Sequence, residues 1–394
     1  MHSRAPSSVA VITALVFLVF MSVQPPSALP ASEPLQIAWA GPLTGDVAQL
    51  GQGWLNGVKL AVDEWNAKGG VLGRQVVIAP EDDQCDPKQA ATVATKIADD
   101  PRNVALIGHF CSGATLAGAP IENKANLPQI VNSSNPRITL QGWHNLFRPI
   151  ANDNIQGKRG VAYVMKALHA TKFALLSDKQ AFGQGVIEVA KSTIEAGGGS
   201  ITSTGGVEPK DVDYSPVLTK IIKMENPDAI VYCTNFPTSA GLMLRQIRQL
   251  GYKKPVIGCD GWFDPAMIKA AGSMGSMTSK ADAAYITFQA PPYSGPEAPA
   301  GVKAFAAKYK TKFGSDPNGY EIYGYEHGNI MLAAIKAAGS TDKSKIIDVL
   351  HTQAVPGILI PRYRFDANGD VVNAPLYIYT VANGQFKLVV QATD

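Results

Sequence analysis

Short apolar runs alternate with longer helix-like segments along the chain from Leu35 onward. Runs such as Leu35–Ala40 and Val104–Gly108 have the length and residue types of buried strands, and Gly69-Gly70 ends the first helical segment. The expected strands are 35–40, 75–79, 104–108, 128–131, 172–176, 200–204, 229–232, 256–258 and 284–288, and the expected helices are 52–67, 87–98, 113–123, 155–168, 185–194, 215–224 and 238–250. Regular alternation of this kind predicts an α/β fold with parallel sheets covered on both faces.

The strand–helix pattern starts twice, because a second round begins near Ile155. Pro291-Pro292 and Gly295-Pro296 then mark a boundary. The later segments have too few strands for a sheet of their own, so they must return to one of the two halves. These segments are the helices expected near 299–313, 319–338 and 344–350, followed by a hairpin of 376–379 and 386–390. We therefore expect two doubly wound parallel-sheet lobes joined by three chain crossings, which together form a hinge.

The first 31 residues resemble an export signal. Arg4 precedes an apolar stretch from Val9 to Phe20, and small residues and prolines follow through Ala31, as in secretory signal peptides. A membrane anchor is the alternative, but the stretch is shorter than the roughly 20 residues that a spanning helix needs. We expect cleavage after Ala28 or Ala31 and a soluble mature protein.

Composition excludes several classes of protein. The formal net charge is only +3 and Lys and Arg form no dense run, so no nucleic-acid partner is expected. The 46% hydrophobic content is that of an ordinary globular chain. The length after signal removal suits two domains, each with its own core.

The four cysteines form two pairs with the same internal spacing, Cys85 with Cys111 and Cys233 with Cys259. Cys111, Cys233 and Cys259 each lie at or just beyond the end of a short apolar run, and Cys85 opens the loop before a helix. In an exported chain such pairs predict disulfides that hold the rim of a binding crevice.

Two polar corners at strand ends are candidate ligand sites, because ligands of doubly wound sheets bind outside the carboxyl ends of the strands. Hydroxyls and backbone N–H groups at Cys111-Ser112-Gly113 and at Asn132–Pro136 could hold a carboxylate. Ser112 or Ser134 alone could equally cap a helix; because both flank one crevice, we favour binding.

Asp260 ends the matching strand of the second half, and there it could receive an ammonium group. A site for a carboxylate opposite a site for an ammonium group would fit an α-amino acid. Alternatively, Asp260 could cap the helix that starts at Pro265.

The motifs of common enzymes are absent from the sequence. The six histidines lack metal-ligand spacing, and His109 is interpreted as a strand-end packing residue. Neither a G-x-S-x-G elbow nor a phosphate-binding loop occurs, and Gly51–Gly57 is only a near-match to a dinucleotide motif. Phe182, Phe236 and Trp262 are individually more typical of a core than of a site. We expect no enzyme activity, no cofactor and no metal.

Several ordered segments resemble one known family, the periplasmic branched-chain amino-acid-binding proteins of ABC importers, with a type I periplasmic-binding-protein fold. The resemblance covers about 35–380 and is carried by 41–45, 66–70, 82–87, 108–112, 178–185 and 365–370. It implies crossings near Asn152, Gln289 and Pro375. The implied domains are a signal peptide (1–31), an N-terminal lobe (32–152 plus 290–375) and a C-terminal lobe (153–289 plus 376–394).

The resemblance also implies roles for individual residues. Cys85 and Cys111 match the family disulfide, Ser112 and Ser134 match hydroxyls that bind carboxylate, and Asp260 matches an acidic partner of the ammonium. Asn132 would contribute a backbone carbonyl to the ammonium, and Leu50, Phe110 and Phe182 would wall the side-chain pocket. The full expected ligand site is Leu50, Phe110, Cys111, Ser112, Asn132, Ser133, Ser134, Phe182, Asn235, Asp260 and Trp262. The pair Cys233 and Cys259 lies outside the family pattern.

Departures from the family cluster around the ligand's side chain. They are Leu50, Asn132, Asn235 and Glu321. The resemblance therefore implies a monomeric periplasmic protein that delivers an α-amino acid, branched-chain or otherwise hydrophobic, to a membrane permease. An aromatic carboxylate or an amide as the ligand, or a ligand-sensing role, stays open.

Overall fold

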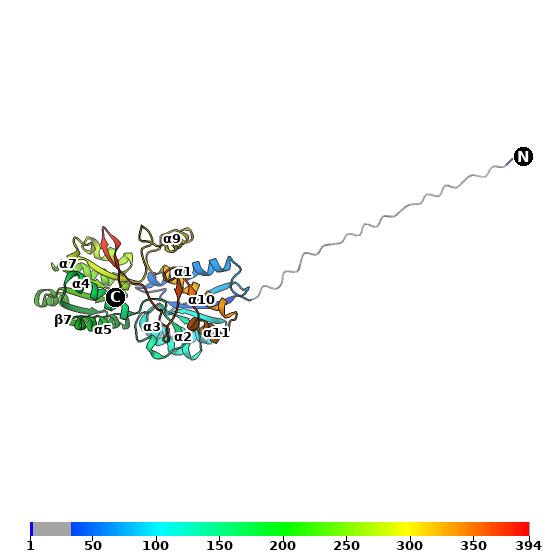
Figure 1. Cartoon of the computed structure of the whole chain (residues 1–394), viewed down its shortest axis with the longest axis horizontal. Helices are drawn as coiled ribbons and strands as arrows, with labels where there is room; N and C mark the ends of the chain where they lie inside the picture. Colours follow the sequence, from blue (N-terminus) through cyan, green and yellow to red (C-terminus); the bar gives the residue numbers. More distant parts are fainter. Residues whose placement is uncertain (3–32, 394) are drawn as a thin grey trace. The chain divides into compact units, whose positions relative to one another are not determined.

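The computed structural model describes residues 1–2 and 33–393 and confirms the predicted α/β fold (Figure 1). The strands are β1 Leu35–Gly41, β2 Val76–Asp82, β3 Asn103–Gly108, β4 Gln129–Ile130, β5 Leu146–Phe147, β6 Lys172–Ser177, β7 Ser200–Gly206, β8 Ala229–Cys233, β9 Val256–Gly258, β10 Ala284–Phe288, β11 Val355–Pro356, β12 Arg362–Tyr363, β13 Tyr377–Ala382 and β14 Gln385–Gln391. The helices are α1 Ala48–Asn66, α2 Pro87–Asp99, α3 Ser112–Lys124, α4 Asp153–Leu168, α5 Ala181–Ala196, α6 Ser215–Thr219, α7 Pro237–Gln249, α8 Pro265–Ala271, α9 Ala300–Phe313, α10 Glu321–Ala338 and α11 Lys343–Thr352.

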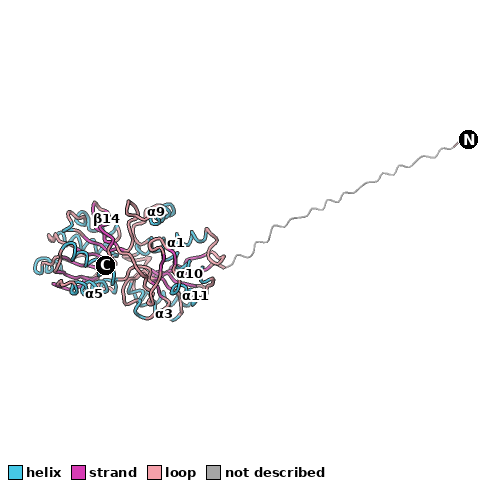
Figure 2. Tube along the Cα trace, in the orientation of Figure 1, coloured by secondary structure: helices cyan, strands magenta, loops and turns pink. Residues whose placement is uncertain are grey.

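Among the described residues, the strands form two large sheets and one small hairpin. The first sheet has the order β2-β1-β3-β4-β5 and is parallel throughout. The second has the order β14-β13-β10-β9-β8-β6-β7, and its neighbouring strands pair in parallel except that β13 runs antiparallel to both β10 and β14. In Figure 2 the strands are magenta and the surrounding helices cyan. β11 and β12 pair separately.

Capping side chains start the helices that lead into the site. Asp86 accepts a hydrogen bond from the backbone N–H of Gln89 at 2.8 Å, and Pro87 occupies the first position of α2. Asn152 does the same for α4 by accepting from the N–H of Ile155. These caps fix where the chain leaves a strand end and enters a helix.

Helix α10 returns to the first sheet. The sequence predicted such a return to one of the two halves, because the later segments have too few strands for a sheet of their own. Helix α10 packs closely on α1, since a Cβ atom at Gly57 or at Gly324 would clash with the backbone of the other helix. The Trp54 ring N–H of α1 donates to Nδ1 of His327 on α10 at 3.1 Å. Trp39 of β1 completes this buried aromatic layer.

The expected signal peptide lies outside the described residues. Residues 33–394 form one compact unit that contains both sheets, and the division into two lobes stays a prediction. Among the described residues, no helix has both the length and the apolar character needed to cross a bilayer.

Candidate functional site

The predicted disulfide between Cys85 and Cys111 is present, with 5.4 Å between the Cα atoms. Cys85 lies in the turn before α2, and Cys111 precedes the first residue of α3. The bond therefore ties the loop after β2 to the start of the helix that carries Ser112.

The predicted disulfide between Cys233 and Cys259 is wrong, because both are buried free thiols. Cys233 and Cys259 are the next facing positions on the parallel strands β8 and β9, directly after the pair Tyr232 and Gly258. Neighbouring strands lie about 4.8 Å apart, a spacing that a disulfide allows, so adjacency at two strand ends does not decide whether the bond forms. The thiol of Cys259 instead donates to the Thr234 carbonyl at 3.7 Å, and burial raises the pKa of both thiols.

The ends of β3 and β4 bring the two serine corners together. The N–H of Asn132 donates to the His109 carbonyl at 3.1 Å, and the Ser112 hydroxyl accepts from the N–H of Asn135 at 3.3 Å. Ser133 points elsewhere, since its hydroxyl lies 2.7 Å from that of Thr115 on α3. Neither Ser112 nor Ser134 provides a side-chain helix cap, so the alternative interpretation of these serines is not seen.

Asp260 lies in a short 3₁₀ turn after β9, where three amide N–H donors reach its carboxylate. They are the Gln156 amide at 3.1 Å, the Gln289 amide at 3.2 Å and the N–H of Gly261 at 3.1 Å. Burial raises the pKa of Asp260. The helix that starts at Pro265 is capped by Asp264, so Asp260 is free of the capping role.

The sequence interpretation missed Asp153, which connects the two corners. Its N–H donates to the Ser134 carbonyl at 2.9 Å, and its Oδ1 accepts from the Gln156 amide nitrogen that also reaches Asp260. Burial and the nearby Asp260 carboxylate raise the pKa of Asp153 to about 7. An acidic residue at the start of a helix is usually explained by its favourable interaction with the helix dipole. For this reason the sequence alone did not identify Asp153 as a site residue.

Apolar side chains from the first half lie beside these groups. The Phe110 ring contacts the rings of Trp54 and Tyr320, with centroids 5.7 and 4.9 Å away, and the Tyr320 hydroxyl hydrogen-bonds to Asp260. Leu50 and Phe182 are buried.

The remaining predicted residues have different surroundings. Trp262 is fully buried against β9 and Tyr232, as a core residue would be. The Asn235 amide lies 3.8 Å from the sulfur of Cys111. Glu321, a departure from the family, accepts from the N–H groups of Asn318 and Gly319.

Two side-chain contacts join the segment after the serine corner to α5 of the second half. The Asn135 amide donates to the Ala181 carbonyl at 2.7 Å, and Arg137 pairs with Glu188 of α5 at 2.9 Å. Ser112, Ser134 and Asp260 are only 1%, 3% and 4% exposed.

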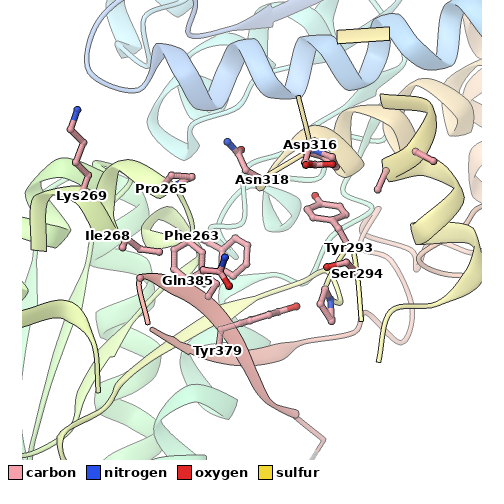
Figure 3. A pocket seen from close by; sticks show the side chains of 16 residues that line it. Phe263, Pro265, Ile268, Lys269, Tyr293, Ser294, Asp316, Asn318, Tyr379 and Gln385 are labelled. Atoms are coloured by element: carbon pink, nitrogen blue, oxygen red, sulfur yellow. The ribbon is translucent and has the colours of Figure 1, made fainter. Parts of the chain in front are cut away.

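A cavity of about 690 Å³ lies elsewhere, among Phe263, Tyr293, Asp316, Tyr379 and Gln385 (Figure 3). None of the predicted site residues lines it. Its walls come from the loop before α8, from the loop before α10 and from the β13–β14 hairpin.

His109 does more than pack at a strand end. Its buried ring lies 2.6 Å from the Asp83 carboxylate and 3.0 Å from the Glu122 carboxylate. Burial alone would lower the pKa of His109, but Glu122 and Asp83 outweigh it and raise that pKa to about 10. No cluster of three or more His, Cys, Asp or Glu in the described part of the chain could hold a metal ion.

Comparison with known proteins decides the family. The sequence profile described as periplasmic binding protein matches residues 34–385. The chain belongs to this family. Because this is a family of binding proteins, the match confirms both the predicted resemblance and the prediction that the chain is not an enzyme.

Individual relatives cover nearly the whole chain. The leucine-, isoleucine-, valine-, threonine- and alanine-binding protein of Pseudomonas aeruginosa is 30% identical, over 89% of this chain and 90% of its own length. A leucine-binding protein from Thermotoga maritima superposes with a TM-score of 0.81 and 27% identity, over 91% of this chain and 98% of that one. A Streptococcus pneumoniae branched-chain amino acid transporter substrate-binding protein, solved with isoleucine, gives 0.80 and 27%, over 90% and 99%.

Proposed function

We propose that this protein is the solute-binding component of an ABC importer and binds an α-amino acid with a hydrophobic side chain. The observation that carries this proposal is the buried juxtaposition of the Ser112 and Ser134 corner with Asp260, linked through Gln156 and Asp153. The named ligands of the relatives from Pseudomonas aeruginosa and Streptococcus pneumoniae support it.

In this proposal each corner binds one end of the zwitterion. The ligand carboxylate accepts from the Ser112 and Ser134 hydroxyls and from N–H groups at the start of α3. The ligand ammonium donates to Asp260 and to the Asn132 carbonyl. Leu50, Phe110 and Phe182 surround an apolar side chain, and Cys111, Ser133, Asn235 and Trp262 support the walls.

An aromatic carboxylate is the second candidate ligand. One similar fold, at 20% identity, belongs to a Rhodopseudomonas palustris solute-binding protein solved with benzoate. Against that ligand stands Asp260, because an anion without an ammonium group would leave this buried carboxylate without a cation. We therefore favour the zwitterion.

Ligand binding would favour closure of two lobes, 32–152 plus 290–375 and 153–289 plus 376–394. A ligand that contacts both lobes stabilises the closed state by the contacts absent from the open state. The closed monomer would then deliver the amino acid to a membrane permease from the periplasm, after cleavage of a signal peptide at 1–31. A ligand-sensing role would use the same closure.

The test is a thermal-shift panel on refolded, ligand-stripped protein. Leucine, isoleucine and valine are expected to raise the melting temperature, since a ligand at 100 times its Kd adds about 2.7 kcal/mol of stability. Phenylalanine tests the size of the pocket, and 4-hydroxybenzoate tests the alternative. Stabilisation by hydroxybenzoate with no response to any amino acid would overturn the proposal.

A further inference from the structure

Asp153 and Asp260 form a pair of buried carboxylates held by one amide. The Gln156 side-chain nitrogen lies 3.1 Å from Oδ1 of Asp153 and 3.1 Å from Oδ1 of Asp260. Asp153 has no exposed surface and Asp260 is almost fully buried. Two carboxylates so close together in a buried place cannot both stay charged unless a cation joins them.

The groups around the pair supply little positive charge. Asp260 faces the Gln289 amide and the Tyr320 hydroxyl, and the buried thiols of Cys233 and Cys259 have pKa values that burial and the nearby carboxyls raise. Asp178, on the loop after β6, adds a further carboxyl near Cys233. Arg148 lowers the pKa of Asp153, but its guanidinium pairs with Asp370 at 2.6 Å.

One buried oxygen atom of the pair, Oδ2 of Asp153, lacks a hydrogen-bond partner. An unpaired buried acceptor is costly, so the pair offers an acceptor that a ligand would have to satisfy. A primary ammonium carries three N–H donors, enough for Asp153, Asp260 and the backbone carbonyl of Asn132.

We propose that Asp153 and Asp260 together bind the primary ammonium of the ligand, and that this ammonium replaces a proton that the pair holds in the free protein. The proposal rests on the proposed function and names its ligand class, α-amino acids with a free primary amine. The displaced proton passes to solvent, so binding strengthens as pH rises. The gain ends once the pH is high enough for the free pair to have lost its proton already.

Calorimetry measures this exchange directly. Leucine is titrated into ligand-stripped protein at pH 6.0 and at pH 8.5, each in two buffers with different ionisation enthalpies. The expected release is 0.5 to 1 proton per leucine at pH 6.0 and close to none at pH 8.5, with tighter binding at the higher pH. Leucine binding without proton release at pH 6.0 overturns this inference and leaves the proposed function standing; no leucine binding at either pH overturns both.

Variants and an analogue assign the effect to Asp153. D153N is expected to lose the proton release and to bind leucine 10- to 100-fold more weakly. The matched control is E326Q, which removes another buried carboxyl. Burial raises the pKa of Glu326 to about 7, and its carboxylate accepts from the N–H groups of Ile358 and Leu359. E326Q should keep the wild-type proton release. N-methyl-leucine, with one N–H fewer, should bind wild-type protein at least 10-fold more weakly than leucine. Equal binding of the two ligands, or wild-type release in folded D153N, would overturn the assignment.

Discussion

Asp260 shows how a single carboxylate can be prepared for a cation. The amides of Gln156 and Gln289 and the N–H of Gly261 orient it, while burial penalises its charge and raises its pKa. Neutral donors fix the position of the carboxylate without cancelling its charge. A ligand ammonium would supply the missing compensation.

Replacement of this carboxylate should weaken amino-acid binding. D260N keeps the size of the side chain but removes its charge, and we expect a loss of about 2 to 5 kcal/mol in binding free energy, measured by isothermal titration of leucine. D264N is the control, because Asp264 is a buried aspartate that caps α8. It should lower the melting temperature and leave leucine affinity near the wild-type value. Equal leucine affinity in D260N and wild type would remove Asp260 from the site.

His109 predicts a pH dependence of stability. Its pKa is about 10 in the folded protein because Glu122 and Asp83 outweigh the effect of burial, whereas an unfolded histidine has a pKa near 6.5. The stabilisation is therefore complete below about pH 6.5 and is lost as pH rises toward 10.

Urea unfolding between pH 6 and pH 10 checks this dependence. Wild-type protein should lose stability over that range, and H109Q should be about 3 kcal/mol less stable at pH 6 with a flatter profile. H144Q is the control, because His144 is exposed and its ring nitrogen hydrogen-bonds to the side-chain oxygen of Asn126. Parallel profiles for wild type and H109Q would contradict a charged His109.

At the scale of elements, the positions of the strands and helices along the chain were largely predictable from the sequence. Strands 256–258 and 284–288 were predicted with the observed bounds, and most other elements began within a few residues of the expected positions. The two-residue strand β5 was missed, because so short a run gives no periodic signal. The predicted bond between Cys233 and Cys259 failed for another reason, since adjacent positions at two strand ends do not by themselves determine whether two thiols are joined.

Thiol counting distinguishes one disulfide from two. Protein unfolded in guanidinium without reductant should give two reactive thiols per chain, from Cys233 and Cys259, and native protein should give almost none because both are buried. Unfolded C233A/C259A protein should give none. A count of zero for unfolded wild-type protein would show that the second disulfide forms after all.

The remaining disulfide should stabilise the fold. C85A/C111A is expected to be about 2 to 4 kcal/mol less stable than wild type, measured by urea unfolding without reductant. Reductant should destabilise wild type and leave this variant unchanged. Equal stability of variant and wild type would mean that the bond only positions the loop.

At the scale of the whole molecule, the site depends on contacts between distant segments. The sequence predicted Ser112, Ser134 and Asp260 from their positions at strand ends. The structure brings them together through Gln156, which the sequence placed only in a helix, and through Asp153, which it left unassigned. Such bridging residues escape sequence analysis because their role depends on which strand ends become neighbours.

Closure is the prediction that belongs to the whole molecule. Leucine should decrease the radius of gyration of ligand-stripped protein in small-angle scattering, because the contacts of Asn135 and Arg137 with α5 then persist. D260N at the same leucine concentration serves as the control and should stay open. An unchanged radius in wild type at saturating leucine would argue against the hinge.

A crystal structure of the protein grown with leucine is the most direct test of the proposed site. We predict one leucine with its carboxylate at Ser112 and Ser134 and its ammonium at Asp260. Leucine bound in the cavity beside Phe263, with Ser112, Ser134 and Asp260 contacting no ligand, would contradict the account.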